Sequence, residues 1–162
     1  MAQEEDGMAA MDLNRMIERL NDLIALDHDA VGAYEAAINR IDVESLRMSL
    51  RAFQADHERH IQDLTRVVVS LGGTPRTKPD AMGVVLKGFT AVTSMRGNEA
   101  ALQAMRGNEL LTNRTYRMAL EEEWSDETRA IIERNYSDEQ RHLAFIEGAL
   151  RNRIWEQTPV QP

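Results

Sequence analysis

Four long stretches of the sequence carry apolar residues at helical spacing, and this pattern constrains the fold more than any other feature. The stretches cover about residues 12–41, 43–71, 99–123 and 126–155, and in each one apolar side chains recur with the 3.6-residue period of an amphipathic helix. Only a few residues separate the first stretch from the second and the third from the fourth, so each pair should form an antiparallel hairpin. The sequence therefore predicts an all-α four-helix bundle of two hairpins.

A long crossover should join the two hairpins, over about residues 72–98. It begins with Gly-Gly-Thr-Pro at residues 72–75, a sequence that stops helices. A short apolar helix is expected over about residues 81–95, before Gly97. The crossover then has enough residues to run the length of the bundle.

The other boundaries follow from terminal composition and capping residues. Residues 1–10 and 156–162 are expected to be disordered, which leaves a single domain over residues 11–155. Asp42 and Ser125 precede the second and fourth helices. Both are expected N-caps, because their side-chain oxygens can accept hydrogen bonds from free backbone N–H groups.

Charge and cysteine content exclude several classes of function. The 162 residues carry a formal net charge of −8, which argues against a basic surface for binding nucleic acid. The absence of cysteine excludes disulfides, thiolate metal sites and thiol catalysis. No apolar run approaches the length of a membrane span, and the acidic start is unlike a signal peptide, so we expect a cytoplasmic protein outside the membrane.

Ionisable residues interrupt every one of the four apolar stripes. They are Asp27 in the first stripe, His57 and His60 in the second, Glu109 in the third, and Glu139 and His142 in the fourth. Two residues of a hairpin are level when their midpoint falls at the turn. The midpoints of the two hairpins lie between residues 42 and 43 and between residues 124 and 125, at the expected turns. All six residues should therefore meet at one level of the core.

The spacing of these residues is typical of metal ligands. Residues three apart share one helix face, so Glu139 and His142 can present an oxygen and a nitrogen to the same ion. A buried charge needs a partner or a metal, because leaving it unpaired costs several kcal/mol. Oxygen and imidazole ligands suit Fe, Mn or Zn. The sequence thus predicts a metal site in the bundle core.

The two halves of the sequence match each other at an offset of 82 residues, which indicates a duplicated helical hairpin. The matching positions are Asp27 and Glu109, Tyr34 and Tyr116, Asp56 and Asp138, His57 and Glu139, Arg59 and Arg141, and His60 and His142.

These residues resemble the ferritin-like superfamily, to which the di-metal carboxylate proteins of the bacterioferritin and rubrerythrin type belong. The resemblance covers about residues 12–155. Glu139-Gln-Arg-His142 matches the Glu-x-x-His motif of the family, and Asp27 and Glu109 fall where its helix-one and helix-three carboxylates lie. The start of the crossover and residues 108–116 further resemble a bacterial ferritin-like subfamily of unassigned function.

The resemblance implies a core site for iron, with Mn and Zn as alternatives, and a homo-oligomer of at least two chains. If the chain is an enzyme, the resemblance implies a ferroxidase- or peroxidase-like oxidoreductase that oxidises Fe(II) with O₂ or a peroxide. Tyr34 follows Asp27 by seven residues, where ferritins and bacterioferritins place a tyrosine beside the site. Tyr34 and Tyr116 would then orient the ligands.

One position departs from the family pattern. His57 stands where the family has a glutamate that can bridge two metals. With three carboxylates and three imidazoles, two divalent ions would be left about one charge short of neutral, by simple counting of ionised carboxylates. This departure could weaken one metal position, favour a single ion or change the preferred metal.

Other interpretations of the same residues are open at this point. The bundle could be free of metal and use the ferritin scaffold for assembly or partner binding. Asp27 and Glu109 could pair with arginines, and Glu35 could replace Asp27 as the helix-one ligand. His28 lies off the apolar stripe and is expected to be solvated.

Overall fold

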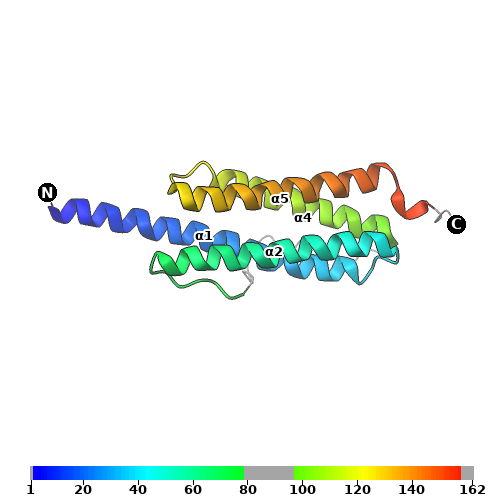
Figure 1. The fold of residues 1–162 in the computed structure, drawn as a ribbon, viewed down its shortest axis with the longest axis horizontal. Helices are drawn as coiled ribbons and strands as arrows, with labels where there is room; N and C mark the ends of the chain where they lie inside the picture. The colour runs from blue at the N-terminus through cyan, green and yellow to red at the C-terminus, as the bar shows by residue number, and fades with distance from the viewer. Residues whose placement is uncertain (1, 79–96, 158–162) are drawn as a thin grey trace.

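The computed structural model describes residues 2–78 and 97–157. Within these residues the chain forms four long helices and one short 3₁₀ helix, and no strand. The helices are α1 (Ala2–Ile38), α2 (Glu44–Ser70), α4 (Gly97–Ala119), α5 (Asp126–Arg151) and η1 (Ile154–Glu156) (Figure 1). The predicted all-α bundle is confirmed, whereas the expected helix over residues 81–95 lies outside the described residues.

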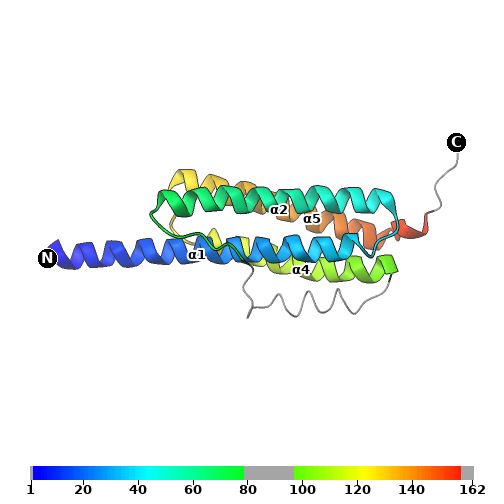
Figure 2. The ribbon, with the colours of Figure 1, turned by 90° about the horizontal axis from the view of Figure 1, so that it is seen from below.

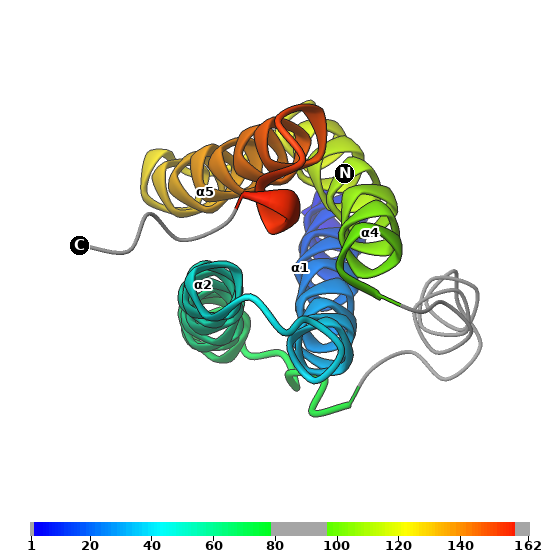
Figure 3. The same ribbon diagram turned by 90° about the vertical axis from the view of Figure 1, so that its right-hand side faces the viewer.

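The four long helices lie side by side along the length of the molecule (Figures 1 and 2). In the end-on view, α1 lies between α2 and α4, and α5 closes the square between α4 and α2 (Figure 3). Helix α4 begins at the end of the bundle where α1 ends, so each helix is antiparallel to both of its neighbours. Asp42 and Asn98 mark this shared end, since the Asn98 amide donates to the Asp42 carboxylate at 2.6 Å.

Helix α1 begins at Ala2, at the start of the segment of residues 1–10 that was expected to be disordered, and ten residues before the expected helix start near Asp12. Acidic side chains favour the N-terminal end of a helix, where the backbone dipole is positive, and alanine has the highest helix propensity. Both kinds of residue occur in residues 2–10. The first turns of α1 extend beyond the ends of the other helices (Figure 1).

One of the two predicted N-caps is confirmed. Ser125 caps α5, since its side chain accepts a hydrogen bond from the backbone N–H of Thr128 at 3.2 Å. The prediction for Asp42 was wrong, because Val43 is the residue before α2 and makes no side-chain cap bond. The Asp42 carboxylate is engaged by Asn98, and the Asp42 backbone N–H donates to the Asn98 side-chain oxygen at 3.0 Å. Asp42 therefore joins the two hairpins instead of capping a helix.

The exit from α2 depends on two glycines. Gly72 has a φ of 78°, the left-handed conformation that favours glycine after a helix. At Gly73 an added Cβ would lie 2.7 Å from Cγ2 of Ile17, so only glycine allows the turn to pack this closely onto α1. Asn21 of α1 then holds the next residues by two hydrogen bonds to their backbone, at 3.0 and 2.8 Å.

Two apolar clusters fill the bundle, one toward each end. The first includes Leu46, Leu50, Leu102, Met105 and Ile146, and the second includes Leu20, Ile24, Leu64, Val68 and Ile132. Burying one such side chain contributes roughly 1.5–3 kcal/mol. The polar interruptions of the four stripes lie between the two clusters along every helix. Among the described helices, none is both long and apolar enough to cross a membrane.

The cap of α5 gives a direct test of this architecture. We expect Ser125→Ala to lower the free energy of unfolding by about 1 kcal/mol, because it frees a backbone N–H in the first turn. Urea denaturation would measure the change. Ser137→Ala, at an exposed position of the same helix, is the matched control and should stay within about 0.5 kcal/mol of the wild type. Equal stability of the two variants would contradict the role of Ser125.

Candidate metal centre

Six ionisable side chains meet in the layer between the two apolar clusters. They are Asp27 on α1, His57 and His60 on α2, Glu109 on α4, and Glu139 and His142 on α5, and each is 0% exposed to solvent. The structure thus brings together all six residues that the sequence placed at one level. The agreement follows from hairpin geometry, because the turn between α1 and α2 and the turn between α4 and α5 lie at the midpoints of the ionisable residues in each hairpin.

The carboxylates of α1 and α4 are each held by a tyrosine of the other hairpin. The Tyr116 hydroxyl donates to Asp27 Oδ2 at 2.6 Å, and the Tyr34 hydroxyl donates to Glu109 Oε1 at 2.6 Å. Burial, together with Asp27 and Glu109 respectively, raises the pKa of Tyr116 and Tyr34 well above the usual value of 10. Both hydroxyls therefore stay protonated and act as donors. Each tyrosine thus binds the carboxylate of the other hairpin, and the two contacts correspond to each other in the 82-residue repeat.

His60 and His142 are oriented by aspartates on the opposite helix. His60 Nε2 lies 3.2 Å from Asp138 Oδ2, and His142 Nε2 lies 3.0 Å from Asp56 Oδ2. A ring N–H that donates to a carboxylate fixes the orientation of the ring and leaves the other nitrogen for a metal. In both histidines that other nitrogen is Nδ1, which faces the buried layer.

Two arginines complete this outer arrangement. Arg59 pairs with both Asp56 and Asp138, and Arg141 pairs with the same two aspartates. The aspartate side chains are mostly buried, at 14% and 18% exposed, whereas the guanidinium side chains are about half exposed. The four charges cancel, so this group joins α2 to α5 without adding net charge beside the buried layer.

Five polar atoms of the layer have no hydrogen-bond partner. They are His57 Nε2, His60 Nδ1, His142 Nδ1 and both carboxylate oxygens of Glu139. Leaving a buried polar atom unpaired costs about 1–3 kcal/mol. Glu139 Oε1 lies only 3.2 Å from His60 Nδ1 but not in hydrogen-bonding geometry. The atoms therefore lie close together in the layer without forming hydrogen bonds to one another.

The donor atoms form two overlapping groups that could each hold an ion. One group contains Asp27, His57, His60 and Glu139, the other contains His57, Glu109, Glu139 and His142, and within each group the ligand atoms lie within 4.8 Å of one another. In the first group, four spacings between donor atoms are 2.8, 3.2, 3.4 and 3.6 Å. A tetrahedral ion with bonds of about 2.1 Å has donors about 3.4 Å apart, so the first group needs little rearrangement. The second group is wider, with spacings of 3.6, 3.8 and 4.0 Å.

Opposite charges stabilise one another within the layer. Burial alone would lower the pKa of His57 and His60, but Glu139 and Asp27 outweigh it and raise the pKa of His60 to about 9 and that of His57 well above 6.5. Burial would raise the pKa of Asp27 and Glu109, but hydrogen bonds with His57 hold both below their usual values. Without a metal, two imidazolium charges thus compensate two carboxylates.

Burial shifts Glu139 and His142 toward their neutral forms. Burial raises the pKa of Glu139 to about 7, and burial lowers the pKa of His142 to about 4. A neutral imidazole is the form that binds metals, so His142 is ready to act as a ligand at neutral pH.

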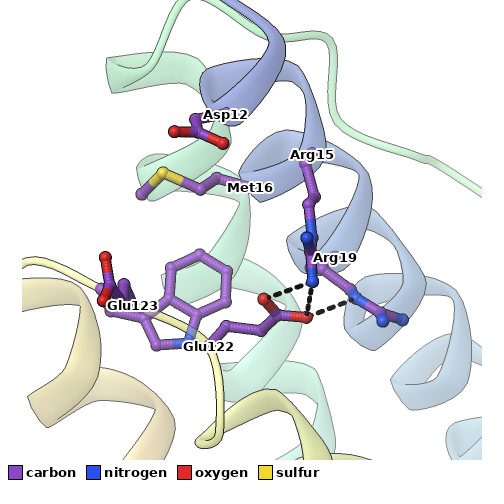
Figure 4. A pocket seen from close by; sticks show the side chains of 7 residues that line it. Asp12, Arg15, Met16, Arg19, Glu122 and Glu123 are labelled. Atoms are coloured by element: carbon purple, nitrogen blue, oxygen red, sulfur yellow. Dashed lines mark hydrogen bonds and ion pairs between the residues drawn. The ribbon is translucent and has the colours of Figure 1, made fainter. Parts of the chain in front are cut away.

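A surface pocket of about 270 Å³ lies between α1 and the connection from α4 to α5 (Figure 4). Glu122 of this pocket accepts hydrogen bonds from Arg15 at 2.9 and 3.0 Å and from Arg19 at 3.2 Å. None of the six buried residues lines it. The pocket is therefore separate from the candidate metal centre.

The structure also bears on three of the alternatives that the sequence left open. Glu35 is exposed and is not the helix-one residue of the layer. His28 is half-buried and lies outside both donor groups. Asp27 and Glu109 contact tyrosine and histidine side chains, while the nearby arginines pair with aspartates outside the layer.

Sequence reasoning assigned no role to four residues that shape the centre. They are Asp56, Asp138, Arg59 and Arg141, which the internal repeat had singled out as matching positions. The repeat could have indicated their role, because each aspartate directly precedes a residue of the buried layer. Asn113 was also missed, and its amide joins α4 to α5 by donating to the backbone carbonyls of Glu109 and Glu139 at 2.8 and 2.9 Å.

Residues 15–122 match the model of a protein family described as a domain of unknown function (DUF2383). A search of curated proteins gave no significant match.

Several solved structures share the fold at low sequence identity. Ferritin-like diiron-carboxylate proteins from Bacillus anthracis superpose with a TM-score of 0.72 at 21% identity, covering 86% of this chain and 97% of theirs. A dodecameric thioferritin, the bacterioferritin-related protein from Bacteroides fragilis, gives 0.74 at 14% identity and covers 88% of each chain. A two-domain protein from Anabaena variabilis, with DJ-1/ThiJ/PfpI-like and ferritin-like domains, gives 0.72 at 14% identity, over 93% of this chain and 40% of its own. These similarities establish the ferritin-like fold.

The raised pKa of His60 predicts how the metal-free protein responds to alkali. The pKa is about 9 in the folded state and about 6.5 in an unfolded chain. The stability from this imidazolium is therefore complete below pH 6.5 and is lost as pH rises toward 9. We expect the melting temperature to fall between pH 7 and 9, with a loss of at most roughly 3 kcal/mol from this group.

The His60→Gln variant separates this effect from general alkaline instability. It should be less stable than the wild type at pH 7, because Asp27 loses a cationic neighbour, and its melting temperature should depend less on pH between 7 and 9. Thermal unfolding followed by circular dichroism in the presence of a chelator would measure both. The same pH dependence in variant and wild type would contradict the assignment.

Proposed function

The chain belongs to the DUF2383 family, and we propose that it binds divalent metal ions in its buried polar layer. The ligands we propose are Asp27, His57, His60, Glu109, Glu139 and His142, in two overlapping positions. The observation that carries the proposal is the set of five buried donor atoms without hydrogen-bond partners. Metal ions would satisfy these atoms and compensate the carboxylate charges.

Iron is the ion we propose first, with Mn and Zn as alternatives, because all three accept oxygen and imidazole ligands. Two proteins of similar fold, described as diiron-carboxylate proteins and as a bacterioferritin-related protein, support this order. Iron, when bound, would supply one-electron redox chemistry. The proposed activity is therefore oxidation of Fe(II) with O₂ or a peroxide, in iron handling or the response to oxidative stress.

The residues around the layer have defined tasks in this function. Tyr34 donates to Oε1 of Glu109 and Tyr116 donates to Oδ2 of Asp27, and each leaves the remaining lone pairs of its carboxylate for metal. The aspartates behind His60 and His142 fix the two rings with Nδ1 facing inward. Removal of such supporting partners typically lowers metal affinity by about 10- to 100-fold.

A metal-free bundle that serves assembly or partner binding is the second candidate. One observation favours it: protonated His57 and His60 already compensate Asp27 and Glu109 without any ion. The two candidates differ in their response to added metal, because an ion that binds only the folded state must raise its stability.

We also propose that the protein is a cytoplasmic homo-oligomer. One protein of similar fold is described as a dodecamer, which supports oligomer formation but not a particular size. Light scattering of the purified chain would give the number of subunits.

Metal binding makes the first prediction from this function. At an Fe(II) or Mn(II) concentration about 100-fold above Kd, the melting temperature should rise by roughly 5–10 °C, with Fe(II) measured without oxygen. Glu139→Ala and His142→Ala should abolish most of the rise, because each removes a ligand of the layer. His28→Gln is the matched control and should behave as the wild type. An unchanged melting temperature of the wild type with Fe(II), Mn(II) and Zn(II) would favour the metal-free candidate.

Proton competition makes the second prediction. Metal can bind only after the protons on His57 and His60 have left, and the pKa of His60 is about 9. Affinity for Mn(II) should therefore keep rising from pH 6 to 8.5, by about tenfold per pH unit for each proton displaced. A site of ordinary histidines would level off above pH 7. Competition with a calibrated chelator at several pH values would distinguish the two, and a plateau above pH 7 would refute the cationic layer.

A further inference from the structure

His57 stands where the two donor groups meet. Its Nδ1 lies 2.8 Å from Asp27 Oδ1 and 3.4 Å from Glu139 Oε1, whereas its Nε2 lies 3.6 Å from Glu109 Oε1. The ring is 0% exposed, and Nε2 has no hydrogen-bond partner. The two nitrogens of one side chain are therefore directed at two different metal positions.

A neutral imidazole cannot serve both positions. One of its nitrogens has a free lone pair, and the other carries a proton. Both donor groups nevertheless include His57. Two ions can be bound together through this ring only if it loses its remaining N–H proton and becomes an imidazolate, with one lone pair on each nitrogen.

The charge of the layer leads to the same requirement. Asp27, Glu109 and Glu139 supply three negative charges when ionised, and His60 and His142 are neutral when they ligate. The surrounding aspartates and arginines cancel one another. Two divalent ions would therefore leave one uncompensated positive charge in the interior, at a cost of several kcal/mol. An imidazolate at position 57 supplies the missing negative charge.

We propose that His57 bridges two divalent ions as an imidazolate, with Nδ1 bound to the ion beside Asp27 and His60 and Nε2 bound to the ion beside Glu109 and His142. The proposal rests on the metal-binding function proposed above. The two ions take the places of the N–H protons of the ring, which leave to solvent, so no further reactant is needed. Glu139 borders both groups, because its Oε1 faces the first group and its Oε2 lies 4.0 Å from His142 Nδ1.

Copper(II) tests this arrangement, because its single unpaired electron reports on a neighbouring ion. The full chain is loaded with Cu(II), unbound metal is removed, and copper content and electron paramagnetic resonance intensity are measured on the same sample. We expect two copper ions per chain and a resonance intensity lower than the copper content requires, because the bridge couples the two spins. His57→Gln should lose this coupling or lose one copper ion, while the matched control His28→Gln should keep both properties.

The outcomes separate this inference from the proposed function. One copper ion per chain with full intensity would overturn the bridge and leave metal binding intact, and no bound copper would overturn both. Two uncoupled ions in the wild type, or a coupled pair that persists in His57→Gln, would also overturn the bridge. The wild-type measurement alone can overturn the bridge even if the variant fails to fold, and circular dichroism establishes whether the variant has folded.

Discussion

Water is excluded from six ionisable side chains in the middle of this bundle, and the rest of the structure depends on how their charges are compensated. Three carboxylates and three imidazoles are each 0% exposed. In a low-dielectric interior, such groups are tolerated only when each charge is paired, hydrogen-bonded or bound to a metal. The tyrosines, aspartates and arginines around the layer satisfy its outer atoms and leave its inner atoms unpaired. Those inner atoms are the ones that converge on the two donor groups.

The helices and the level of the site could be predicted because both follow from regular geometry. Helical periodicity marked the four long helices, and the midpoints of the hairpins placed Asp27 beside the two histidines and Glu109 beside Glu139 and His142. Local capping was predicted less well, since Asp42 is engaged by Asn98 from a different hairpin, a contact that no local pattern contains. The early start of α1 was missed because its first residues were judged by their polarity and not by their helix propensity.

The finer features of the site required coordinates. Sequence spacing shows that His57 and His60 share a helix face, but it cannot show which ring nitrogen points inward. For His60 and His142 that choice depends on aspartates of the opposite helix, which lie more than 75 residues away in the sequence. For His57 the structure places both ring nitrogens inside the layer. This position departs from the ferritin-like pattern, which has a glutamate there, and the two inward nitrogens make the histidine a candidate bridge. The ferritin-like fold is shared with distant proteins, whereas the histidine at this position has to be explained by the residues of this chain.

The most direct test of metal binding in the buried layer is an anomalous diffraction measurement on crystals grown with Mn(II) or with Fe(II) under anaerobic conditions. Anomalous difference density inside the four-helix layer, within bonding distance of Glu139 and the Nδ1 atoms of His60 and His142, is the predicted result. Density restricted to surface carboxylates, with His60 and His142 still facing an empty layer, would contradict the account.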